Sequence, residues 1–274
     1  MATILTFGRI LLGLCFALNG GWWLYTWDLR AAYLDQIGAP SLVIVPVAAV
    51  YLVCGLVVAA GWAVRPATLP LMAVAGLIAT LLHTDLGPGG IGEYPIDAHT
   101  QVNAKALLVQ LALVGSLMLA FAAPRRGAPI DLRAVVLGRV LIGGYFVANA
   151  LWQALFYETR FEHVQASGGN TNAIPVAIAV QIIFGMLIVA GRAVRGSTIP
   201  LAVVTIASTI LVHGDLSPGA AYPPNLQIHQ WFVKAAIVAG LILLFALGPV
   251  AAPAPTRRDL PAGDQNSKPP TPVD

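Results

Sequence analysis

The chain has 274 residues, of which 58% are hydrophobic and only 10% are charged. Soluble domains carry about 25% charged residues, because their surfaces must be compatible with water. This composition excludes an ordinary soluble domain and predicts a protein whose solvent is mostly lipid. The formal net charge of +3 does not require a nucleic-acid partner, because the orientation of the chain in a membrane accounts for it, as shown below.

Eight apolar runs follow one another along the chain, and most are close to the roughly 20 residues with which a helix spans hydrocarbon. They lie at Ile4–Tyr25, Leu42–Trp62, Thr68–His83, Ala104–Ala123, Val135–Phe156, Ile174–Ala190, Ser197–Val212 and Phe232–Val250. Membrane-spanning strands are a poor alternative, because the runs lack the two-residue alternation of barrel strands. We therefore expect an all-α polytopic membrane protein of eight transmembrane helices. The first run is too long for the apolar region of a signal peptide and lacks a small-x-small cleavage site, so it is expected to remain as the first helix.

Basic residues are distributed unequally between the two sides of these predicted helices. Eleven lie on the side that holds both termini, whereas the opposite, outer side has only Arg30, Lys105, Arg160 and Lys234. Because short cytoplasmic loops are enriched in lysine and arginine, we expect both termini to face the cytoplasm. The basic balance of the chain then reflects its orientation in the membrane.

The two halves of the chain match each other at an offset of 130 residues. The matching positions include Arg9/Arg139, Gly13/Gly143, Phe16/Phe146, Asn19/Asn149, Gly55/Gly185, Gly61/Gly191, Arg65/Arg195 and His83/His213. Such periodicity indicates a tandem repeat, with four helices in 1–126 and four in 127–250. Because four is an even number, both units should enter the membrane in the same direction, related by a pseudo-two-fold axis along the membrane normal. The Pro-rich, polar segment 251–274 is expected to be a disordered cytoplasmic tail.

All five histidines fall on the predicted outer side, and four of them form two repeat-matched pairs, His83 with His99 and His213 with His229. Asp85 and Asp215 follow the first histidine of each pair by two residues. His83 and His213 end predicted helices, where the negative end of the helix dipole favours an imidazolium, and the aspartate can pair with it or fix its tautomer. One interpretation is that these residues cap interfacial helix ends.

A second interpretation gives the same residues a chemical role. Imidazole and phenol groups can donate hydrogen bonds to a quinone carbonyl and exchange protons with it. The candidate catalytic residues are then His83, Asp85, His99, His213, Asp215 and His229, and the candidate quinone-binding residues are Tyr94, Tyr222, Asn19 and Asn149. Metal ligation by the histidines and aspartates is a third interpretation. The spacing matches no closed zinc pattern and there are no thiolates in register, so we assign no metal site.

Four polar residues within or at the ends of the predicted spans leave two interpretations open. Asn19 and Asn149 are either site residues or interhelical contacts, because a polar side chain at membrane depth needs a partner. Lys105 and Lys234 begin the fourth and eighth helices, and they either reach the lipid headgroups or attract an anionic substrate.

Other residues of the spans are interpreted as structural. Arg9 and Arg139 lie about one turn inside the first helix of each half and are expected to extend to the cytoplasmic surface. Cys15 and Cys54 are expected to be buried, inert thiols. Close helix packing is expected at Gly13, Gly20, Gly143 and Gly144.

The four-helix unit resembles the DoxX/DoxD family of bacterial membrane proteins. The family repeat opens with Arg-x(3)-Gly-x(2)-Phe and continues through a second helix ending in Gly-x(5)-Gly followed by Arg. This chain has that pattern at Arg9, Gly13, Phe16, Gly55, Gly61 and Arg65, and again at Arg139, Gly143, Phe146, Gly185, Gly191 and Arg195. It departs from the family at Tyr51 and Gln181, where many members carry a glutamate.

The resemblance implies a place in the bacterial inner membrane and an association with redox functions. DoxD-type subunits belong to thiosulfate:quinone oxidoreductase, and DoxX-type proteins are linked to membrane oxidoreductase and thiol-stress complexes. It therefore implies a membrane or extracytoplasmic oxidoreductase as partner.

Three hypotheses of function follow. The first is a redox-associated subunit, with or without catalysis of its own, that handles quinone or docks an oxidoreductase near the outer surface. The second is a non-catalytic scaffold or assembly subunit of a respiratory or envelope complex. The third, small-molecule transport, is weaker because no ionisable residue is predicted at mid-membrane.

Overall fold

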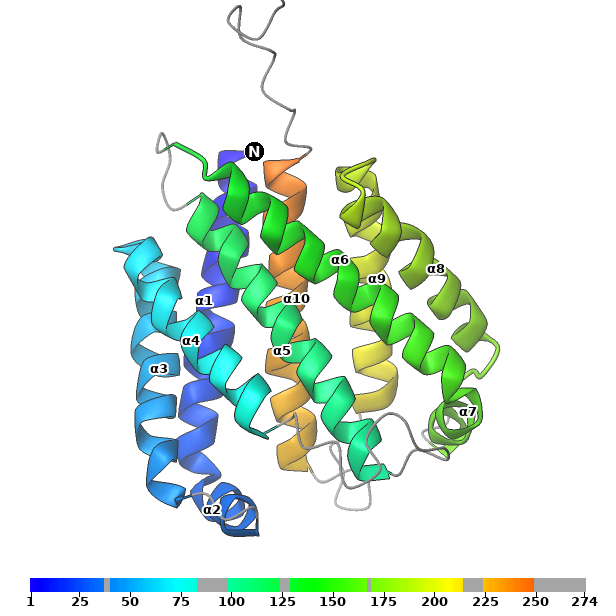
Figure 1. Cartoon of the computed structure of the whole chain (residues 1–274), viewed down its shortest axis with the longest axis horizontal. Helices are drawn as coiled ribbons and strands as arrows, with labels where there is room; N and C mark the ends of the chain where they lie inside the picture. The colour runs from blue at the N-terminus through cyan, green and yellow to red at the C-terminus, as the bar shows by residue number, and fades with distance from the viewer. Residues whose placement is uncertain (37–39, 83–97, 124–128, 167–168, 214–223, 249–274) are drawn as a thin grey trace, which may run out of the picture.

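The computed structural model describes residues 1–36, 40–82, 98–123, 129–166, 169–213 and 224–248. Every regular element among these residues is a helix, which confirms the all-α prediction for this part of the chain (Figure 1). The long helices are α1 (Ala2–Tyr25), α3 (Ile44–Ala60), α4 (Val64–Leu82), α5 (Ala98–Ala122), α6 (Leu132–Leu155), α8 (Ala173–Val189), α9 (Val194–His213) and α10 (Pro224–Leu247). The short ones are α2 (Trp27–Gln36), the 3₁₀ turn η1 (Ser41–Val43) and α7 (Tyr157–Ala166).

Six helices in the described part of the chain are long and apolar enough to cross a membrane. They lie at Ala2–Tyr25, Ser41–Ala60, Ala104–Ala122, Leu132–Leu155, Val194–His213 and Gln227–Leu247. Two shorter apolar helices, Val64–Thr80 and Ala173–Val189, accompany them. These lengths and compositions indicate a multi-pass membrane protein in a lipid bilayer. The count of eight spans requires that α4 and α8 also cross, and it stays a prediction.

The outward face of α9 shows the apolar surface that lipid requires. Ile199, Val203, Ile206 and Ile210 recur every three or four residues and remain between 46% and 59% exposed. A helix in water would bury such a stripe against a core. Here the stripe faces away from the bundle, as expected where hydrocarbon is the solvent.

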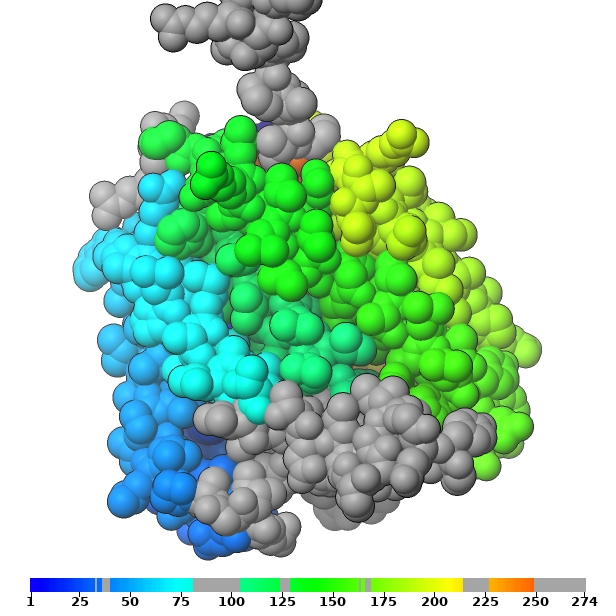
Figure 2. All heavy atoms as spheres, viewed as in Figure 1, coloured from blue at the N-terminus to red at the C-terminus, as the bar shows by residue number. Residues whose placement is uncertain are grey.

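The helices form one bundle in which the first helix of each half packs against the last helix of the other half. α1 packs against α3 and α10, and α6 packs against α8 and α5. α5 and α10 also contact each other along the middle of the bundle (Figure 1). In the space-filling view, α3, α4, α5, α6 and α8 are visible on the face toward the viewer (Figure 2). The division into units 1–126 and 127–250 stays a prediction, and the predicted tail 251–274 lies outside the described residues.

Glycines bring the backbones of α1 and α3 into direct contact. A Cβ atom on Gly13 would lie 2.5 Å from the carbonyl oxygen of Gly55, and one on Gly20 would lie 2.7 Å from the carbonyl oxygen of Ala48. Gly143 makes the equivalent approach to Gly185 between α6 and α8. Close packing is therefore confirmed at Gly13, Gly20 and Gly143.

The packing role predicted for Gly144 is wrong. A Cβ atom on this residue would meet nothing within 4 Å. Neighbouring residues of a helix point about 100° apart, so only one of two adjacent glycines can face a given partner.

Tight turns after α3 and α8 place two glycines beside two arginines. Gly61 has φ +77° and Gly191 has φ +72°, which is the left-handed conformation common just after a helix. The guanidinium of Arg9 lies against Gly61, and that of Arg139 lies against Gly191. A cation there interacts favourably with the negative end of the helix dipole. The two arginines therefore contact the ends of α3 and α8, whereas the sequence predicted only that they reach the surface.

Two short polar helices, α2 and α7, were not predicted from the sequence. They follow α1 and α6 directly and lie at the end of the bundle opposite the N-terminus (Figure 1). We call this the α2/α7 end. α5 and α10 begin at this end and α9 finishes there, so it gathers the residues that the sequence placed on the outer side.

Candidate functional site

The structure describes only part of the predicted His-x-Asp site. Five candidates, His83, Asp85, Tyr94, Asp215 and Tyr222, lie outside the described residues. His99 lies in the first turn of α5, and its side chain lies outside the described part as well. Four candidates remain with described side chains: His213, His229, Asn19 and Asn149.

His229 and Asn19 contact each other across the α1–α10 packing. The Nδ1 atom of His229 lies 2.9 Å from the Oδ1 atom of Asn19. Because an amide oxygen only accepts, His229 Nδ1 carries the hydrogen in this arrangement. Asn19 is buried and His229 is half-buried. The structure thus joins two predicted site residues that are 210 positions apart in the chain.

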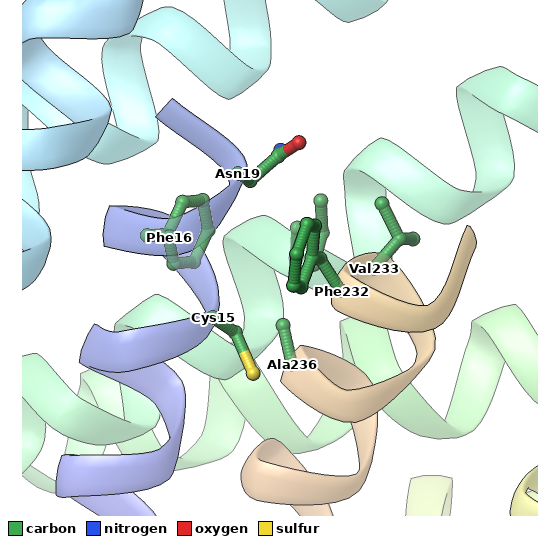
Figure 3. Close-up of a pocket in the computed structure, with 7 residues that line it drawn as sticks. Cys15, Phe16, Asn19, Phe232, Val233 and Ala236 are labelled. Carbon is green, nitrogen blue, oxygen red and sulfur yellow. The ribbon is translucent and has the colours of Figure 1, made fainter. Parts of the chain in front are cut away.

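A small cavity lies beside this pair, between α1 and α10. Cys15, Phe16 and Asn19 line it from α1, and Phe232 and Ala236 line it from α10 (Figure 3). Its volume is about 10 Å³, which accommodates no more than one water molecule. This cavity is therefore too small for a quinone ring.

His213 contributes a backbone contact at the described end of α9. Its carbonyl oxygen accepts a hydrogen bond from Trp231 Nε1 at 2.8 Å. Trp231 belongs to α10, so this bond ties the end of α9 to the next helix. An indole that satisfies a helix-terminal carbonyl is consistent with the capping interpretation of this position.

Asn149 is an interhelical contact within the second half. Its Nδ2 atom donates to Gln181 Oε1 at 2.7 Å, and both residues are buried, with 7% and 4% of their surface exposed. Asn19 and Asn149 occupy matching positions but have different partners. Gln181 replaces Tyr51 of the first half, and the phenol ring of Tyr51 instead packs edge-to-face on Phe16 and Trp23.

Replacing Asn149 with leucine is expected to destabilise the bundle, because Gln181 then keeps a buried amide without its partner. The expected loss is about 1–2 kcal/mol in the free energy of unfolding. Thermal unfolding of the purified protein in detergent measures it. The double variant Asn149→Leu/Gln181→Leu should recover part of the loss, since no unpaired amide remains. Equal midpoints for all variants would show that the bond contributes nothing.

Tyr145 forms a hydrogen bond with Lys234. The comparison of the two halves of the sequence did not select this tyrosine as a site residue. Lys234 Nζ donates to the Tyr145 hydroxyl at 2.9 Å and lies 5.6 Å from the centre of the same ring. Tyr145 is buried, with 4% of its surface exposed, and it matches Cys15 in the first half. Lys234 is the eleventh residue of α10 and Lys105 the eighth of α5, so neither begins its helix as the sequence predicted. Tyr145 and Lys234 form the best-defined donor pair among the described residues of this half of the bundle.

Two further cations join this pair. The positive charges of Lys234 and Arg160 both act on Lys105, and Arg160 also interacts electrostatically with Tyr145. Burial lowers the pKa of the Arg160 guanidinium, and the Tyr145 phenol opposes that shift. We call Lys105, Arg160 and Lys234 the basic cluster.

Arg30, the fourth cation of this end, is already engaged. Its guanidinium lies 4.1 Å from the ring centre of Trp23, and its Nε atom donates to the Thr26 hydroxyl at 3.2 Å. Burial lowers its pKa to about 10, and Tyr51 opposes the shift. Arg160 matches Arg30 in the chain, but Gln153 stands where Trp23 would supply the aromatic face.

An apolar groove between α5 and α6 reaches Tyr145. It has a volume of about 190 Å³ and is lined by Leu108, Leu111, Val140, Leu141, Gly144 and Tyr145. Leu111 and Val140 are each 38% exposed, so the groove opens on the outside of the bundle. Gly144, which packs against no helix, leaves room in this groove.

Comparisons of the chain with protein-family models, with curated proteins and with solved structures give no match. Within the described ranges, no group of three or more His, Cys, Asp or Glu residues is placed to hold a metal ion.

Proposed function

We propose that the chain is a redox-associated protein of the bacterial inner membrane that binds a quinone in the α5/α6 groove. In this proposal it has eight spans in two parallel four-helix units, and both termini face the cytoplasm. The matching residues at an offset of 130 positions and the resemblance to the DoxX/DoxD family support that architecture. The α2/α7 end is then the outer end.

The observation that carries the proposal is an apolar groove on the outside of the bundle that is lined in part by Tyr145, the hydrogen-bond partner of Lys234. Quinones partition into hydrocarbon, and their carbonyl oxygens accept hydrogen bonds. The aliphatic walls of the groove suit the ring and its isoprenoid tail. In this proposal the Tyr145 hydroxyl and the Lys234 ammonium donate hydrogen bonds to a quinone carbonyl oxygen, and both groups can exchange protons.

The proposed role is quinone handling for a membrane or extracytoplasmic oxidoreductase partner. The His229–Asn19 contact belongs to the same end of the bundle and holds α10, the helix that carries Lys234, against α1. Asn19 and His229 would then act as positioning residues, and Tyr145 and Lys234 as the residues that touch quinone.

Quinone content of the purified full-length protein tests this proposal. Protein extracted in mild detergent should contain quinone in stoichiometric amount. Tyr145→Phe should lower the retained quinone about 3- to 10-fold through loss of one hydrogen-bond donor. Gly144→Leu should remove it by filling the groove.

Two matched variants serve as controls. Tyr157→Phe alters a partly exposed tyrosine of α7, and Gly76→Leu enlarges a glycine of α4 whose Cβ would meet nothing within 4 Å. Both should retain quinone as the parent protein does. Quinone retained by Gly144→Leu would contradict the proposal. A stoichiometric protein partner without quinone would favour a scaffold, and solute flux into proteoliposomes would favour a transporter.

A further inference from the structure

The basic cluster concentrates positive charge without a described counter-charge. The charges that act on Lys105 come from Lys234 and Arg160, and both are positive. Among the described residues, no carboxylate forms an ion pair with any of the three. Like charges held together repel one another, and charges within proteins are normally paired. Within the described part of the chain, the cluster therefore has no counter-charge.

Arg160 adds a second, independent observation. Its Nε atom is buried and has no hydrogen-bond partner among the described residues. A buried donor without an acceptor in a native structure calls for an explanation, and an absent ligand is one.

The acidic residues that the structure describes at the same end are exposed and form no ion pair with the cluster. Glu158 and Glu162 are two positions from Arg160 on α7, and residues two apart on a helix do not face each other. Both side chains are exposed, as are Asp28 and Asp35 on α2. None of these four described carboxylates therefore neutralises the cluster.

We propose that the basic cluster binds an oxyanion, such as a phosphate, sulfate or carboxylate group. Lys105 from α5, Arg160 from α7 and Lys234 from α10 hold it by charge-assisted hydrogen bonds. Lys105 is exposed, so the anion can enter. Arg30 of α2 stacks on Trp23 instead and takes no part.

This anion site goes beyond the proposed quinone function and does not depend on it. The oxyanion can come from an anionic lipid headgroup or from a water-soluble anion. Both sources offer the same charged oxygens, and the experiment distinguishes them.

The test uses the full-length protein in nanodiscs of zwitterionic phosphatidylcholine. In one arm, inorganic phosphate or sulfate is added, and chloride at the same ionic strength is the control. The other arm adds phosphatidylglycerol to the nanodiscs. Thermal unfolding followed by tryptophan fluorescence reports binding, because a ligand that binds only the folded state raises the midpoint. A rise of the midpoint with the soluble anion or with phosphatidylglycerol that is larger in the parent than in the cluster variants supports the site. The arm in which it occurs identifies the source of the oxyanion.

Three variants decide whether the response comes from the cluster. Lys105→Gln and Arg160→Gln should each weaken anion binding about 10- to 100-fold. Arg192→Gln, which removes an exposed cation elsewhere, should bind as the parent does. Lys105 is exposed, so this variant is expected to fold even if Arg160→Gln does not.

The anion-free proteins provide a second readout. Lys105→Gln should be at least as stable as the parent without the anion, since removing one like charge relieves repulsion. If Lys105 had a purely structural role, Lys105→Gln would instead be less stable than the parent without the anion. The inference is overturned if the parent, Lys105→Gln and Arg192→Gln respond equally to both probes. Quinone content measured in the same samples separates this result from failure of the quinone proposal.

Discussion

Replacing Gly55 with alanine is expected to force α1 and α3 apart. A Cβ atom at this position would lie 2.6 Å from the backbone nitrogen of Ala17 and 2.7 Å from the carbonyl oxygen of Gly13. Both neighbours are backbone atoms, so no side-chain rotation can relieve the overlap. Overpacking of this kind lowers the free energy of unfolding by about 1–3 kcal/mol, and contact with a rigid helix backbone places Gly55→Ala near the upper end.

Thermal unfolding in detergent measures this effect, and the chain offers two graded comparisons. Gly76→Ala adds the same methyl group on α4, where it would meet nothing within 4 Å, and alanine favours helix over glycine. Its midpoint should stay level or rise. At Gly185, the nearest atoms to a Cβ are the Gly143 carbonyl oxygen and a side-chain carbon of Val147, both at 3.0 Å, so the overlap is smaller. Gly185→Ala should therefore lose less stability than Gly55→Ala, and the reverse order would refute the packing account.

Gly61→Ala is expected to destabilise the protein in two ways. Its φ of +77° strains any residue with a side chain, at about 1–2 kcal/mol. The added Cβ would also lie 2.6 Å from the Nη2 atom of Arg9, so the guanidinium must leave the end of α3. Gly191→Ala should show the same loss, because Arg139 occupies the matching place.

A double-variant cycle separates the two contributions to the Gly61→Ala effect. If displacement of Arg9 matters, Gly61→Ala should lose less in an Arg9→Gln background than in the parent. Gly196→Ala, on α9 with nothing within 4 Å of its Cβ, serves as the neutral comparison. If the stability losses of Gly61→Ala and Arg9→Gln simply add in the double variant, backbone strain alone accounts for the Gly61→Ala effect.

The helical class and the membrane setting were predictable from the sequence because they depend on composition and run length. Side-chain direction was less accessible. Gly143 and Gly144 are adjacent, and the sequence does not tell which of them faces α8. The short helices α2 and α7 escaped prediction because they are polar and carry no apolar run.

The candidate site was predictable only where the two halves carry identical residues. That criterion selected Asn19, Asn149 and His229, but not their surroundings. Tyr145 matches a cysteine and Gln181 matches a tyrosine, so comparison of the halves passed over both. Lys105 and Lys234 lie one residue out of register. Contacts made by side chains that differ between the halves depend on tertiary packing, so they can be identified only from the structure.

The contact between α1 and α10 also affects how the protein can be made. α1 leaves the ribosome well before α10, against which it packs, so one face of α1 stays uncovered until α10 has been made. Contacts between such distant parts of a chain form late in folding. A chain that stops before α10 would expose this face of α1 and the inner face of α5 together, and quality-control proteases would meet it as an open, unfinished bundle.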